Sequence, residues 1–112
     1  MATGKEKRKE ERVPVDLWIE ASRDGELYFQ RASNLSVGGA YFTQTIPLPV
    51  GSRVALKFEL PGEPIEVVCE GEIVTAKDFG MGVSFINLNA GDRKKIEGVI
   101  AKIAAKVQKL TK

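Results

Sequence analysis

The sequence contains no histidine and only one cysteine, Cys69, and both scarcities limit what the protein can do. Without histidine, a serine or cysteine nucleophile lacks its usual imidazole base, and zinc sites that contain histidine are excluded. One cysteine cannot form a disulfide within the chain or a pair of metal-binding thiolates. We therefore expect a protein that is not an enzyme and holds no cofactor, and the low cysteine content favours the cytoplasm.

Long hydrophobic runs are also missing. Residues 1–12 are polar and charged and lack the apolar segment of a signal peptide. No later stretch approaches the roughly 20 apolar residues that a membrane-spanning helix needs. The sequence therefore predicts neither a visible export signal nor membrane insertion, and its 112 residues are enough for one small domain.

The net charge of +2 conceals an uneven distribution of charge. Residues 1–12 carry a net charge of +2 and residues 92–112 a net charge of +5, whereas residues 13–91 carry −5. A protein that binds duplex nucleic acid usually places Lys and Arg on its folded body. This distribution therefore argues against duplex binding, but it allows a compact anionic ligand near one end.

Alternation of apolar and polar residues predicts six short strands separated by turns. The expected strands cover residues 13–21, 27–32, 40–44, 53–60, 65–75 and 81–86. Turn residues such as Asp24-Gly25 and Pro61-Gly62 separate them. We expect a break of the second strand at Asn34, and a bulge or bend of the fifth at Gly71.

Apolar residues then recur at helical spacing from Ile96 onward, which predicts an amphipathic helix over about residues 90–110. Asn89 followed by Asp92 is a plausible cap for its first turn. The sequence thus predicts a mainly β fold, a six-stranded antiparallel β-barrel with a C-terminal amphipathic α-helix. Residues 13–112 would form this single domain, behind a flexible basic N-terminal tail of residues 1–12.

Two clusters could bind a ligand, and the first contains Arg8 and Arg12. Four residues apart, their side chains point the same way in a helix and in an extended chain, so they can act as a clamp in either conformation. A guanidinium group matches a phosphate or the O6/N7 edge of guanine. The alternative is a solvated run of charge at a chain end.

The second cluster contains Asn34, Ser36, Gly38 and Gly39. The amide and hydroxyl groups can bond a base edge or a phosphate, and glycine lets a backbone N–H group approach closely. The alternative is a simple turn, because turns favour these residue types.

In this order and spacing, the two clusters resemble the RxxxR and [D/N]xSxxG motifs of the PilZ family. Gly80 to Phe85 is similar to the GxGVxF strand of that family. The resemblance implies a β-barrel that binds the bacterial second messenger cyclic di-GMP.

The resemblance also implies roles for individual residues. The two motif arginines of the family, Arg8 and Arg12 here, wrap over the ligand and contact guanine and phosphate. The opposing wall would come from Asn34, Ser36 and Gly39, where Asn replaces a common Asp. Further candidates for contact are Lys7, Arg31 and Gly38.

We therefore expect a cyclic di-GMP receptor that acts as an adaptor. Ligand binding would order the tail against the barrel and change the interaction with a motility, biofilm or envelope-related protein partner. One alternative is an interaction module of the same fold that binds no nucleotide. Another is a small barrel that binds single-stranded nucleic acid, although the acidic body and the few aromatic residues argue against it. Ligand stoichiometry, a monomeric or homodimeric state, and contact of Trp18 or Tyr41 with the ligand stay open.

Overall fold

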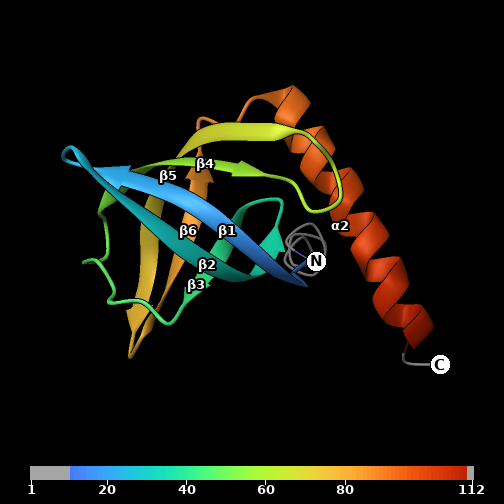
Figure 1. Cartoon of the computed structure of the whole chain (residues 1–112), viewed down its shortest axis with the longest axis horizontal. Coiled ribbons are helices and arrows are strands. Elements are labelled where there is room, and N and C mark those ends of the chain that lie inside the picture. Colours follow the sequence, from blue (N-terminus) through green and yellow to red (C-terminus); the bar gives the residue numbers. More distant parts are fainter. Residues whose placement is uncertain (1–10, 111–112) are drawn as a thin grey trace, which may run out of the picture.

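The computed structural model describes residues 11–110, and their side chains as far as Val107. Six strands form a closed barrel, and one helix lies against one end of it (Figure 1). The elements are β1 (Val13–Arg23), β2 (Glu26–Ser36), β3 (Gly39–Thr43), β4 (Arg53–Glu59), β5 (Glu66–Lys77), β6 (Gly80–Ile86) and α2 (Ala90–Leu110). The mainly β barrel with a C-terminal helix is thereby confirmed.

The strands follow one another around the barrel in the order β1-β2-β3-β6-β5-β4, and every neighbouring pair is antiparallel. The pairing of β1 with β4 closes the barrel. Side chains that alternate inward fill its interior, because successive residues of a strand point to opposite faces. The largest that are fully buried include Ile19, Leu35, Phe42, Leu56 and Ile73.

The second strand is longer than its sequence pattern predicts. It runs to Ser36, so Asn34 lies in β2 and not in a connecting turn. A register shift between Ala32 and Asn34 interrupts the simple alternation, which explains why the sequence there resembles the end of a strand. The expected break at Asn34 is therefore wrong, and the β2–β3 connection is only Val37 and Gly38.

Gly71 does not mark a bulge, so the bulge that we expected there is wrong. The irregularity of β5 lies between Ile73 and Thr75 in its pairing with β6. Gly71 points inward, where a Cβ atom would lie 2.5 Å from Cγ2 of Val83 and 2.7 Å from Cδ1 of Leu56. Glycine is required there because the opposing side chains occupy the space.

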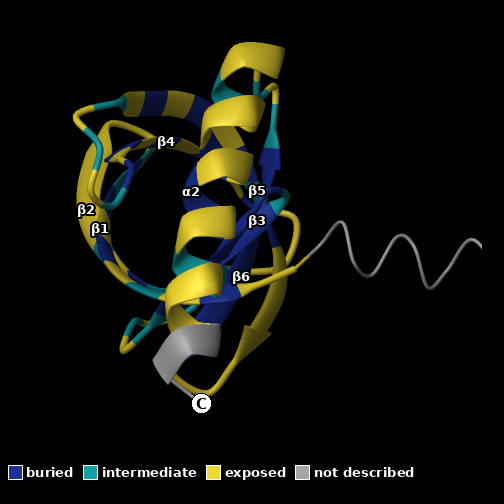
Figure 2. Cartoon of the chain, turned by 90° about the vertical axis from the view of Figure 1, so that its right-hand side faces the viewer, coloured by how far each residue is buried: buried dark blue, intermediate teal, exposed yellow. Residues whose placement is uncertain are grey.

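The helix packs mainly through its N-terminal half. Ile96, Val99 and Ile100 are buried, whereas Val107 is 36% exposed. Toward its C-terminus the helix turns away from the barrel (Figure 1), and its outward face is exposed (Figure 2). Asn89 caps the first turn as predicted, since its Oδ1 accepts a 2.7 Å hydrogen bond from the Asp92 amide. Within residues 11–110, no helix is long and apolar enough to cross a membrane.

Candidate ligand-binding site

Arg12 and Asn34, which belong to different sequence clusters, meet on the outer surface at the start of β1. Asn34 is paired with Pro14 in the β1–β2 ladder, so the end of β2 lies beside the chain as it enters the barrel. Nη1 of Arg12 donates a 2.9 Å hydrogen bond to Oδ1 of Asn34. A guanidinium group has five N–H donors, and the bond to Asn34 uses one of them.

Ser36 and Gly39 build the neighbouring turn. The Ser36 side chain is fully buried, and its hydroxyl accepts a 3.2 Å bond from the Gly38 amide and donates a 3.3 Å bond to the Gly39 carbonyl. A Cβ atom at Gly39 would collide with the Val83 carbonyl oxygen on β6. The amide of Phe85 also bonds the Gly38 carbonyl, at 2.8 Å. These residues shape the wall beside Asn34, and the Ser36 side chain presents no polar atom to solvent.

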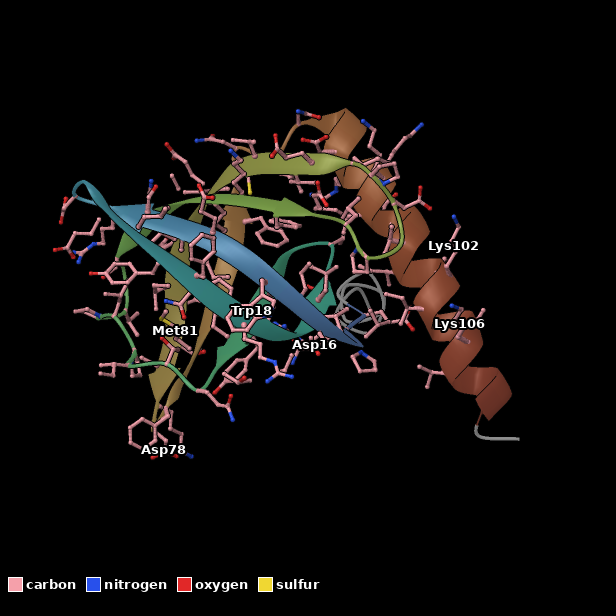
Figure 3. The ribbon with its side chains drawn as sticks, in the orientation of Figure 1. Asp16, Trp18, Asp78, Met81, Lys102 and Lys106 are labelled. Atoms are coloured by element: carbon pink, nitrogen blue, oxygen red, sulfur yellow. The ribbon has the colours of Figure 1, made fainter. Side chains whose placement is uncertain are left out.

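Arg31 lies on the same outer face, but its guanidinium is already paired with the carboxylate of Asp16. Its Nε and Nη2 donate hydrogen bonds of 2.9 and 3.2 Å to the two carboxylate oxygens of Asp16. These bonds raise the pKa of the Arg31 guanidinium above its usual value. Trp18 is paired with Arg31 across the strands, and Figure 3 shows it near Asp16 on the same part of β1. An anionic ligand would have to displace Asp16 to reach Arg31.

Two of the predicted contacts cannot be assessed, because Arg8 and Lys7 lie outside the described residues. The same holds for residues 1–10 of the expected tail. Among the remaining candidates, the structure joins Arg12 to Asn34, and it places Gly38 in the turn with Ser36 and Gly39.

Tyr41 is one of the two aromatic residues whose contact with the ligand sequence reasoning left open, and its strand position is next to Asn34. It stands directly opposite Asn34 in the β2–β3 ladder and opposite Gly82 in the β3–β6 ladder. A Cβ atom at Gly80 would lie 2.7 Å from Cζ of Tyr41, so the ring occupies space that only glycine leaves free. The spacing Gly80-x-Gly82 is the signal that could have predicted a side chain lying across β6.

The side chains that meet at the site are ones that bind a ligand. Within the described part of the chain, no group of three or more acidic or cysteine residues could hold a metal ion. Burial, with smaller contributions from Asp92 and Glu70, raises the pKa of the Cys69 thiol to about 11, so the thiolate nucleophile is scarce at neutral pH. What the surface offers is a guanidinium, an amide and an aromatic ring.

Comparison with protein-family models gives one family. A model of the PilZ domain matches residues 6–102. A comparison with curated proteins finds no match.

Several solved structures share the fold. The Bacillus subtilis inhibitor of motility (MotI/DgrA) is 18% identical, with a TM-score of 0.76 over 88% of this chain and 52% of its own. The PilZ domain of YcgR from Escherichia coli, solved with c-di-GMP, is 12% identical, with a TM-score of 0.70 over 93% of this chain and 96% of its own. PlzA from Borreliella burgdorferi, in complex with c-di-GMP, is 20% identical, with a TM-score of 0.63 over 88% and 43%. The chain thus spans about half the length of MotI and nearly all of the isolated YcgR domain.

Proposed function

The chain belongs to the PilZ domain family, and on this premise we propose that it is a receptor for cyclic di-GMP. The observation that carries the proposal is the 2.9 Å hydrogen bond between Arg12 and Asn34. It joins one residue from each of the two motif-like clusters, 22 positions apart in the chain, on one patch of surface. Structures that share this fold were solved with the same nucleotide, which supports the choice of ligand.

The chemistry of the patch fits the ligand. Cyclic di-GMP carries two phosphates and two guanines, and a guanidinium can donate paired hydrogen bonds to either. Asn34 holds the Arg12 side chain on the barrel surface, which reduces the entropy lost when a ligand binds. We propose that Arg8, four residues earlier, closes over the ligand in the same way, and that ordering of residues 1–12 is the signal.

The adaptor role is supported by large apolar side chains that face solvent. Phe29 is 64% exposed, Ile46 is 82% exposed and Phe79 is 73% exposed. Where such side chains form one contiguous patch, they mark a surface that contacts another protein. The partner in this proposal belongs to motility, attachment or secretion machinery, and the receptor itself catalyses no reaction. The same side chains also favour the second candidate, an interaction module that binds no nucleotide.

Isothermal titration with cyclic di-GMP tests the proposal, with GTP and cyclic di-AMP as controls for selectivity. Loss of charge-assisted hydrogen bonds in Arg12→Ala should weaken binding about ten- to a hundred-fold, with little change in stability. Arg23→Ala is the matched control, because Arg23 is an exposed arginine at the far end of β1. If the folded wild-type protein does not bind the nucleotide, the receptor proposal is wrong and the nucleotide-free module replaces it.

A further inference from the structure

The ring of Tyr41 lies over two glycines of the neighbouring strand β6. Its neighbours Ala40 and Phe42 are fully buried inside the barrel, so Tyr41 points outward from β3. On β6, Gly80 and Gly82 also point outward, because Met81 and Val83 are buried. Two bare positions therefore lie side by side with the tyrosine, and no β6 side chain competes for that surface.

The ring lies along β6 and does not stand away from it. A Cβ atom at Gly80 would be 2.7 Å from Cζ and 2.9 Å from Cε2 of Tyr41. One at Gly82 would be 3.9 Å from Cδ1, although the nearest atom there is Oγ1 of Thr75, at 2.6 Å. The two ends of the ring therefore rest against two successive outward positions. The residue is half-buried, so part of the side chain stays accessible to a ligand.

Near the base of the Tyr41 side chain lie polar groups that can hydrogen-bond the edge of a purine. Directly opposite residues in an antiparallel pair have Cβ atoms about 5 Å apart, so Asn34 lies beside the base of the Tyr41 side chain, while the ring itself extends over β6. Asn34 in turn holds the guanidinium of Arg12. An aromatic platform with an amide and a guanidinium at its edge can stack a base and bond its polar edge at once.

We propose that the outer face of Tyr41 is the platform on which one guanine of the cyclic dinucleotide stacks, with Asn34 and Arg12 at its edge. The inference rests on the proposed receptor function and assigns to this site a residue that neither sequence cluster contains. Because the ring is already held against Gly80 and Gly82, stacking costs little side-chain entropy.

Trp18 is the competing platform and serves as the control. It is 59% exposed and lies on the same outer face, but on β1. Its cross-strand neighbour is Arg31, whose guanidinium already donates a hydrogen bond to the carboxylate of Asp16. No pair of glycines seats its ring.

The test compares Tyr41→Leu, Tyr41→Phe and Trp18→Leu. Leucine still covers the two glycines but has no flat face, whereas phenylalanine keeps the ring. Affinity for cyclic di-GMP should fall about ten-fold or more in Tyr41→Leu, and stay near the wild-type value in Tyr41→Phe and Trp18→Leu. Thermal unfolding of each variant shows whether it is folded.

A second measurement reports stacking directly. In an analogue of cyclic di-GMP that carries 2-aminopurine, stacking on the ring should quench the base fluorescence in the wild-type protein and in Tyr41→Phe. Folded Tyr41→Leu, saturated with the analogue, should recover the emission.

If folded Tyr41→Leu binds and quenches like wild type while Arg12→Ala loses binding, the platform is wrong and the receptor stands. Loss of binding in Trp18→Leu alone assigns the stacking to Trp18 and also overturns the inference. If wild-type protein binds no cyclic di-GMP, the receptor proposal fails, and the platform fails with it.

Discussion

Replacing Gly39 with alanine should destabilise the barrel, although Gly39 belongs to a motif associated with ligand binding. The new Cβ atom would collide with the carbonyl oxygen of Val83 and lie 3.2 Å from its carbonyl carbon and 3.3 Å from Cα of Ser84. All three obstacles are backbone atoms of β6, so no side chain can rotate away. Relief requires β3 and β6 to separate where Gly39 pairs with Ser84.

Overpacking costs about 1–3 kcal/mol, and a backbone obstacle places Gly39→Ala near about 3 kcal/mol. For a domain of this size, about 1 kcal/mol lowers the midpoint of thermal unfolding by about 4–8 °C, so we expect a fall of about 12–24 °C. Circular dichroism during heating measures it.

Gly98→Ala is the matched control, since Gly98 is an exposed helical residue with no atom within 4 Å of its missing Cβ. It should stabilise the protein by about 0.5–1 kcal/mol. Equal midpoints for wild type and Gly39→Ala would show that β6 moves aside freely, and would refute this reasoning.

Three further predictions concern other positions in the barrel and the helix. Ser36→Ala should lower the free energy of unfolding by about 1–3 kcal/mol in urea titrations, because the buried hydroxyl's two hydrogen bonds are lost; an unchanged value would mean that the turn does not depend on it. Ile96→Ala should cost about 2–5 kcal/mol and Val107→Ala under about 1 kcal/mol, since only the first is fully buried; similar costs would contradict packing through the N-terminal half of the helix.

Cys69, whose pKa is raised to about 11, should react with a disulfide reagent at pH 8 about 100-fold more slowly in native than in denatured protein. Because this acid's pKa is higher in the folded state, its contribution to stability is complete below the unfolded pKa of about 8.5 and is lost as the pH rises through about 11. Cys69→Ala should lose less stability across that alkaline range than wild type, and parallel curves would count against a buried thiol.

Sequence pattern predicted the strands and the helix well where burial alternates simply. In β4 the residues from Arg53 to Glu59 alternate between exposed and buried without interruption, and the pattern gives the strand directly. The pattern gave wrong expectations at Asn34 and Gly71, where the physical cause lies in pairing and packing between strands. A register shift in β2 and the side chains of Leu56 and Val83 cannot be deduced from local spacing.

The candidate site, too, could be predicted only in part, because local spacing does not reveal contacts between strands. Residue type and spacing indicated Arg12 and Asn34, whose side chains do meet, but they could not separate contact residues from residues that build the turn. The place of Tyr41 beside Asn34 and Gly82 follows from strand pairing. That pairing is known only once β3 is placed between β2 and β6.

The second cluster therefore contains two kinds of residue whose loss should have different consequences. Ser36 and Gly39 fix the β2–β3 connection through a buried hydroxyl and a close backbone approach. The side chain of Asn34, on β2, accepts a hydrogen bond from the exposed Arg12. A protein of this fold could therefore lose the arginine and the asparagine, keep the serine and the glycine, and remain a stable barrel that binds no nucleotide. Asn34→Ala with Arg12→Ala should reproduce that state here, with the unfolding midpoint preserved and the ligand affinity lost, whereas Ser36→Ala should lower the midpoint itself.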